Sequence, residues 1–286
     1  MDSDNVAVNR SAVGGVLGTP DFMAPEIVRG EARPSNQTDL YSLGVLLFYL
    51  FHLGHPLMGK KVLAVHSWDI AARNWLFGKD AVFIFDPKDK SNEAVGFDVD
   101  PIGEAGGNPL KYWALYPASF RNTFVKAFTD GLKDPDRRVT ELEWLESIGG
   151  LRNAMFLCSC GKPNFYEAEA LPGAGAYSKS CWSCGRVPKL PFRIRIGRFI
   201  VMLNADTKLT PHHIGEGEAF EFSTAIAEVV KHPTDPNLWG LKNLSDDKWV
   251  VTLPNGGLRD VETGRSAPLV TGTKINFGPV EGEIRY

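Results

Sequence analysis

All four cysteines of this 286-residue chain lie in one short segment, as Cys158-x-Cys160 and Cys181-x-x-Cys184. A glycine follows each pair and suits the tight turn that brings two thiolates onto one ion. Two such turns separated by twenty residues are the pattern of a four-cysteine zinc ribbon. We therefore predict that residues 156–190 form a small zinc ribbon.

Four cysteine ligands would complete the coordination shell, so the predicted zinc would be structural and not catalytic. A segment this short is not expected to fold without its metal. Two other interpretations stay open from the residues alone, namely a redox disulfide pair and four free thiols.

The cysteine segment separates two parts that differ in their sequence patterns. Residues 1–155 show the apolar spacing of helices, whereas residues 191–286 are rich in β-branched residues, glycine and turn signals. We therefore predict a multidomain protein, with a mainly α-helical part, the ribbon, and an all-β sandwich or barrel.

The composition is that of a soluble globular protein, with 43% hydrophobic and 23% charged residues. A net charge of -3 gives no reason to expect nucleic acid or a membrane surface as a partner. The N-terminus lacks the basic and apolar regions of a signal peptide, and the longest apolar run, residues 43–53, is too short to span a bilayer. These features predict a cytoplasmic protein.

The longest predicted helix covers residues 38–54, which are apolar nearly all round and are therefore expected to be buried on every side. Gly54 and Pro56 are expected to end it. A second helix is expected near residues 67–78, with Ser67 as its N-cap.

A third helix is predicted over residues 117–132, where an apolar residue recurs at every fourth position. The T-x-x-E capping box of Thr140 and Glu143 marks the start of a fourth helix. Between the second and third helices, residues 80–110 are rich in Gly, Asp and Pro and are predicted to form a long loop.

Three motifs of the helical part occur in an order and at separations typical of one family. GTPDFMAPE forms residues 18–26, Asp39 begins DLYSLG, and Arg138 lies in DPDRRVT. Together they resemble the C-terminal lobe of a bacterial-type serine/threonine protein kinase, from the activation segment onward. The alternative left open is an unrelated helical bundle with a chance A-P-E.

The resemblance implies roles for single residues. Glu26 and Arg138 would form a buried, bidentate ion pair. Asp39 would accept hydrogen bonds from the catalytic-loop backbone, and Thr19 would lie beside the catalytic aspartate, in the loop that cradles the substrate. The G-T-P-x-F form implies serine or threonine as the phosphate acceptor.

Other parts that phosphoryl transfer needs are missing from the sequence. The chain has no G-x-G-x-x-G, no H-R-D and no D-F-G. Asp2-Ser3-Asp4 could stand for D-F-G and make Asp2 a magnesium ligand, although a polar terminus without a role explains these residues equally well. The first interpretation implies that Met1 is internal and that an upstream half is absent.

The resemblance implies an ATP-dependent serine/threonine kinase acting on proteins, truncated and inactive as supplied. ATP and magnesium would bind only with the missing N-terminal half. The alternative is a non-catalytic half-kinase that serves as a scaffold or adaptor in a signalling or stress-response complex.

The third part shows strand patterns. Residues 192–199, 226–232 and 247–253 are strand candidates, residues 254–257 form a hairpin turn, and TKINFG closes the series. The order WGLKNLS to TKINFG, over the last 75 or so residues, resembles the second half of a forkhead-associated domain, a phosphothreonine-binding β-sandwich.

The chain departs from that family where phosphate would bind. IGEG at Ile214 replaces I-G-R, and no S-x-x-H is present. Phosphopeptide binding is therefore doubtful, and an adaptor role is at least as well supported. Asn243 matches the asparagine before the family's last strands, or else is a turn residue. His212 and His213 are predicted to be surface or turn residues without metal, because no third ligand is evident.

Overall fold

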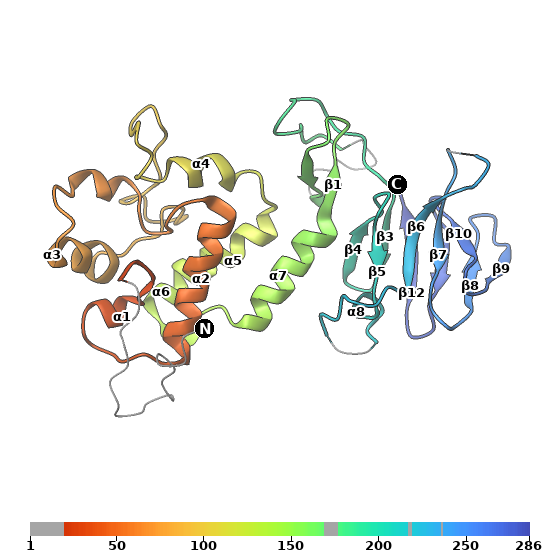
Figure 1. Ribbon diagram of the computed structural model, residues 1–286, viewed down its shortest axis with the longest axis horizontal. Coiled ribbons are helices and arrows are strands. Elements are labelled where there is room, and N and C mark those ends of the chain that lie inside the picture. Colours follow the sequence, from red (N-terminus) through yellow and green to blue (C-terminus); the bar gives the residue numbers. More distant parts are fainter. Residues whose placement is uncertain (1–19, 169–176, 217–218, 236) are drawn as a thin grey trace. The chain divides into compact units, whose positions relative to one another are not determined.

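The computed structural model describes residues 20–168, 177–216, 219–235 and 237–286 (Figure 1). The chain divides into two compact units between Ser147 and Ile148. Among the described residues, the regular elements of the first unit are helices, whereas the strands all lie in the second unit, in antiparallel sheets. The cysteine segment thus belongs to the same unit as the β domain.

The first unit contains short helical turns as well as longer helices. The turns are η2 (Pro20–Phe22), η3 (Lys60–Ala64), the π-helical η4 (Asn74–Lys79) and η5 (Pro135–Arg137). The α-helices are α1 (Pro25–Val28), α2 (Asn36–His52), α3 (Ile70–Arg73), α4 (Gly107–Trp113), α5 (Ala118–Phe128), α6 (Asp130–Lys133) and α7 (Glu141–Ala154).

Helix α2 begins and ends differently from the prediction. Ser35 is its N-cap and forms a capping box with Thr38. Leu53, with φ 55°, takes the left-handed position that Gly54 was expected to fill. Gly54 is needed for another reason, because a Cβ there would lie 2.6 Å from Cγ of Pro109.

The prediction that this helix is buried on every side was wrong. Val45 and Phe48 are fully buried, but Leu46 is 49% exposed, Leu50 66% and Leu53 55%. These three leucines form one apolar face, here called the open face of α2, that no described residue of the chain covers.

Aromatic side chains fill the core on the buried side of α2. Phe48 meets Phe83, Phe124 and Phe128 edge to face, with ring centroids 5.4–6.0 Å apart. Phe83 comes from the predicted long loop, which Asn92 holds in place. The fully buried Asn92 amide donates to the carbonyl oxygens of Leu57 and Val82.

Three other helix predictions can be compared with the structure. Asp69, and not Ser67, caps α3, because its carboxylate accepts the N–H of Ala72. The expected third helix is broken near Thr129 into α5 and α6. The capping box of Thr140 and Glu143 is confirmed at the start of α7.

The second unit contains three antiparallel sheets within its described residues. The cysteine segment has β1 (Met155–Leu157) and β2 (Pro163–Phe165). The remaining elements are β3 (Arg193–Ile196), β4 (Phe199–Met202), β5 (Lys208–Leu209), α8 (Pro211–Ile214), β6 (Ala227–Lys231), β7 (Trp239–Asn243), β8 (Trp249–Thr252), β9 (Leu258–Val261), β10 (Ser266–Pro268), β11 (Lys274–Asn276) and β12 (Glu281–Arg285).

Two of these sheets share one core. The strand orders are β10-β7-β6-β5 and β4-β3-β12-β11-β8-β9 (Figure 1). Buried side chains of both sheets, such as Leu241 of the first and Ile194 and Trp249 of the second, form one cluster. The predicted alternation of the first strand candidate is confirmed, although the strand turns at Gly197 to form the β3–β4 hairpin. The predicted turn at residues 254–257 joins β8 to β9.

The cysteine segment packs onto the sandwich through its own small core. Phe156, Tyr166 and Tyr177 of the segment are buried together with Met202 of β4. The guanidinium of Arg193 also lies over the ring of Tyr166, 5.2 Å from its centroid. These contacts fix the four-cysteine turns to the β domain within the unit.

Candidate functional site

The four cysteine thiols lie close together. Sγ of Cys158 is 3.8 Å from Sγ of Cys184, and Sγ of Cys160 is 3.7 Å from Sγ of Cys181. All four Sγ atoms lie within 4.8 Å of one another. A tetrahedral ion with metal–sulfur distances of about 2.3 Å requires sulfurs about 3.8 Å apart. The cluster therefore has the dimensions to hold a metal ion such as zinc.

Sharp turns shape the cluster, and donated hydrogen bonds favour the thiolate of Cys181, whereas burial and the three neighbouring thiols raise the pKa of Cys160 to about 11. Gly161 and Gly185 have φ values of 79° and 72°, the left-handed conformation that glycine adopts without strain. The backbone N–H of Cys184 and the amide of Asn164 help to lower the pKa of Cys181 to about 6. Asn164, which is buried, was not found from the sequence, because it becomes a neighbour of Cys181 only through the β1–β2 turn.

An ion pair joins the segment after η2 to the turn before α7. Nη2 of Arg138 donates to Oε2 of Glu26 at 2.8 Å; the Arg138 side chain is buried, and that of Glu26 is 13% exposed. The pair is held by one hydrogen bond and is not bidentate. The other guanidinium nitrogens donate to the carbonyl oxygens of Gly131 and Gln37.

The turn η2, just before α1, is anchored at three points. Arg73 of α3 pairs with the carboxylate of Asp21 at 2.6 Å, and Oγ of Ser42 donates to the carbonyl of Phe22. The buried His55 donates from Nε2 to the carbonyl of Asp21 at 2.7 Å. Sequence reasoning missed these anchors, since each bond joins residues that are at least twenty positions apart.

His55 is held in one neutral tautomer. A carbonyl can only accept, so Nε2 carries the proton, while Nδ1 accepts the backbone N–H of Leu57. Burial lowers the pKa of His55 to about 4, and it has the same effect on His52 and His213.

This depression predicts loss of stability in mild acid. His52, His55 and His213 protonate near pH 6.5 in the unfolded chain but near pH 4 in the folded chain, so their contribution to stability is complete above pH 6.5 and is lost between these two values. At pH 5 each such histidine is expected to cost about 2 kcal/mol relative to pH 7. Urea unfolding at both pH values measures this loss. A His55→Gln variant should show a smaller pH dependence.

The remaining residues predicted from the kinase resemblance lie in different environments. Asp39 is in the first turn of α2, where burial raises the pKa of its carboxyl group. Its carboxylate forms no hydrogen bond or ion pair with another described residue. Thr19 and Asp2 lie outside the described residues.

The β domain uses its candidate residues internally. Asn243 is fully buried, and its amide donates to the carbonyls of Asp247 and Val261 and accepts from Ser245. It therefore closes the turn between β7 and β8. His212 and His213 are buried in α8 and are not surface residues, and His213 accepts from Thr210 and hydrogen-bonds to Asn153.

A short stretch of this chain is similar in sequence to known serine/threonine kinases. The chain is 45% identical over 58 residues to the serine/threonine-protein kinase PknD of Chlamydia abortus, and 45% identical over 53 residues to that of Chlamydia felis. It is 38% identical over 62 residues to PknD of Chlamydia trachomatis. These matches cover 20%, 18% and 21% of this chain and 6% of each relative. About a fifth of the chain is thus similar in sequence to serine/threonine kinases.

Other comparisons are negative. No protein-family model matches the chain, and no solved structure matches it significantly. Among the helices of the described segments, none combines the length and apolar character needed to cross a bilayer.

Proposed function

We propose that residues 1–155 are the C-terminal lobe of a serine/threonine protein kinase, linked to a structural zinc ribbon and a forkhead-associated-like sandwich. The observation that carries this proposal is the buried contact between Glu26 and Arg138. It ties the A-P-E segment to the turn before α7, as the family resemblance implies. The short matches to PknD support the same assignment.

Two further features support a lobe that works with additional protein. The open face of α2 leaves three leucines exposed. Asp39 has a carboxylate with no hydrogen-bond partner among the described residues, and the kinase resemblance would make it the residue that holds a catalytic loop. Phosphoryl transfer would come from an N-terminal lobe and catalytic loop that bind ATP and magnesium. The chain alone would contribute the platform for a protein substrate.

In this proposal the β domain is an adaptor that does not bind phosphothreonine through Asn243. The Asn243 amide spends its hydrogen-bonding groups inside the domain, on Ser245 and Asp247 of the β7–β8 turn and on the carbonyl of Val261 in β9. Glu216 also places a negative charge where the family resemblance would require an arginine.

The first experiment is the intact mass of the endogenous protein, captured with an antibody against the β domain. A mass well above 31.5 kDa is expected if this chain is part of a complete kinase. A mass of 31.5 kDa would instead support the half-kinase scaffold. In parallel, the purified chain is expected to transfer no phosphate from ATP to protein, and robust transfer would overturn the proposal.

The open face of α2 gives a second test. Leu46→Glu combined with Leu50→Lys would replace apolar surface by a helical i, i+4 ion pair. We expect less aggregation with a melting temperature within a few degrees of the parent, because both side chains are exposed. Light scattering and thermal unfolding measure both effects. A loss of folding would show that this face is buried in solution, and Val45→Glu, at a fully buried position, is the destabilising control.

A further inference from the structure

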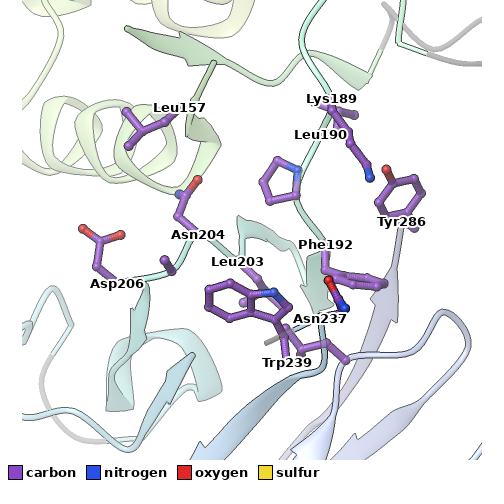
Figure 2. A pocket seen from close by; sticks show the side chains of 13 residues that line it. Leu157, Lys189, Leu190, Phe192, Leu203, Asn204, Asp206, Asn237, Trp239 and Tyr286 are labelled. Atoms are coloured by element: carbon purple, nitrogen blue, oxygen red, sulfur yellow. The ribbon is translucent and has the colours of Figure 1, made fainter. Parts of the chain in front are cut away.

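A pocket of about 790 Å³ lies at one end of the sandwich (Figure 2). The β6–β7 register places Lys231 opposite Trp239 at this end and Ala227 opposite Asn243 at the other. Trp239 lines the pocket. The pocket is therefore at the opposite end of this strand pair from Asn243.

Aromatic and aliphatic side chains form the pocket wall. Phe192, Leu203 and Trp239 lie together at its base, and Tyr286 packs edge to face on Phe192 at 5.3 Å (Figure 2). The ammonium of Lys231 lies 5.0 Å from the Trp239 ring centroid and supports that ring. Leu157 and Tyr286 are more than half exposed, so the wall continues as apolar surface.

One strip of backbone beside this wall has unused hydrogen-bonding groups. Residues 187–191, which lead from the last cysteine turn into β3, belong to no helix or strand. The backbone groups of Lys189 and Leu190, which both line the pocket, form no hydrogen bond with another described residue. An extended peptide laid beside such a strip can supply the missing partners, as in strand addition to a sheet edge.

Two side chains of opposite charge flank the apolar base. Figure 2 shows Lys189 and Asp206 on opposite sides of the pocket. Both are exposed, and neither forms an ion pair within the described part of the chain. A uniformly anionic ligand such as a phosphate would meet Asp206 as well as Lys189. The charge pattern favours a ligand that carries both signs, separated by an apolar group.

We propose that this pocket binds an extended segment of another protein, in which a leucine-like side chain stands between an acidic and a basic residue. The apolar side chain would lie on Trp239 and Phe192. The basic residue would face Asp206 and the acidic residue would face Lys189, while the peptide backbone pairs with Lys189 and Leu190. The assignment does not depend on kinase activity.

The test uses the full chain and the fluorescein-labelled peptide GGEALARGG, with binding followed by fluorescence anisotropy. Saturable binding is expected, and GGEAAARGG should bind at least about tenfold more weakly because it buries no leucine. Asp206→Arg and Lys189→Glu should each weaken binding about three- to fivefold. The double variant should prefer the charge-exchanged peptide GGRALAEGG.

The matched control is Asp246→Arg, which makes the same charge change at an exposed position beyond the Asn243 end of β7. It should bind GGEALARGG with the affinity of the parent. If it loses as much affinity as Asp206→Arg does, the effect of Asp206→Arg comes from net charge and not from the pocket. The proposal is overturned if GGEALARGG does not saturate, or if it binds no better than GGEAAARGG. Sedimentation that shows dimers disrupted by Asp206→Arg would assign the pocket to a second copy of the chain and would also overturn it.

Discussion

A Cys181→Ser chain is expected to bind no zinc and to lose the folded structure of the cysteine segment, whereas the parent should carry one zinc per chain. The free energy that a structural zinc supplies is on the order of 10 kcal/mol, as large as the net stability of a typical domain. Phe156 and Tyr177, which are buried in the small core of the cysteine segment, should become accessible. Metal analysis and limited proteolysis measure the two effects.

Ser183→Ala is the matched control, since Ser183 lies in the same turn but offers no ligand. It should retain zinc and resist proteolysis as the parent does. If the parent holds no zinc and the segment is nevertheless protected from protease, the metal is not what folds it, and the zinc assignment fails.

Arg138→Met is expected to lower the free energy of unfolding of the helical unit by about 3–5 kcal/mol, because it leaves the Glu26 carboxylate buried without its partner. The carbonyl oxygens of Gly131 and Gln37 would also lose their donors. Urea denaturation at pH 7 measures the loss. Glu26→Gln in the same chain should recover part of it, since a neutral amide costs less to bury than a charge.

The exposed pair of Lys60 and Glu93 provides the comparison. Both side chains are at least 39% exposed, so Lys60→Met should cost no more than about 1 kcal/mol. Equal losses in the two variants would contradict the importance assigned to the buried contact.

Features that depend on neighbouring residues could be predicted from the sequence. The Thr140–Glu143 capping box, the alternation of Ile194 and Ile196, and the turn at residues 254–257 each need only a few consecutive side chains. The four-cysteine cluster was also predictable, because each glycine-bearing turn presents two thiolates by itself.

Features that depend on tertiary contacts could not be predicted in this way. His55 acquires its neutral state from burial and from the Asp21 carbonyl, which lies 34 positions away. Whether α2 is covered on all sides depends on which elements pack around it, and its apolar sequence alone gave the wrong answer at Leu46 and Leu50. From the sequence, Asn243 either matched the asparagine before the last strands of the resembled family or was a turn residue, and its hydrogen bonds to Asp247 and Val261 depend on the fold.

Because Gly54 lies against Pro109, which residues are tolerated at one of these positions depends on the residue at the other. A Cβ at position 54 would lie 2.6 Å from the proline ring, closer than real Cβ contacts occur. Alanine at position 54 therefore requires a smaller residue at position 109. If both codons were randomised and folded chains were selected, the surviving residues would be correlated in pairs, although the positions are 55 apart in the chain.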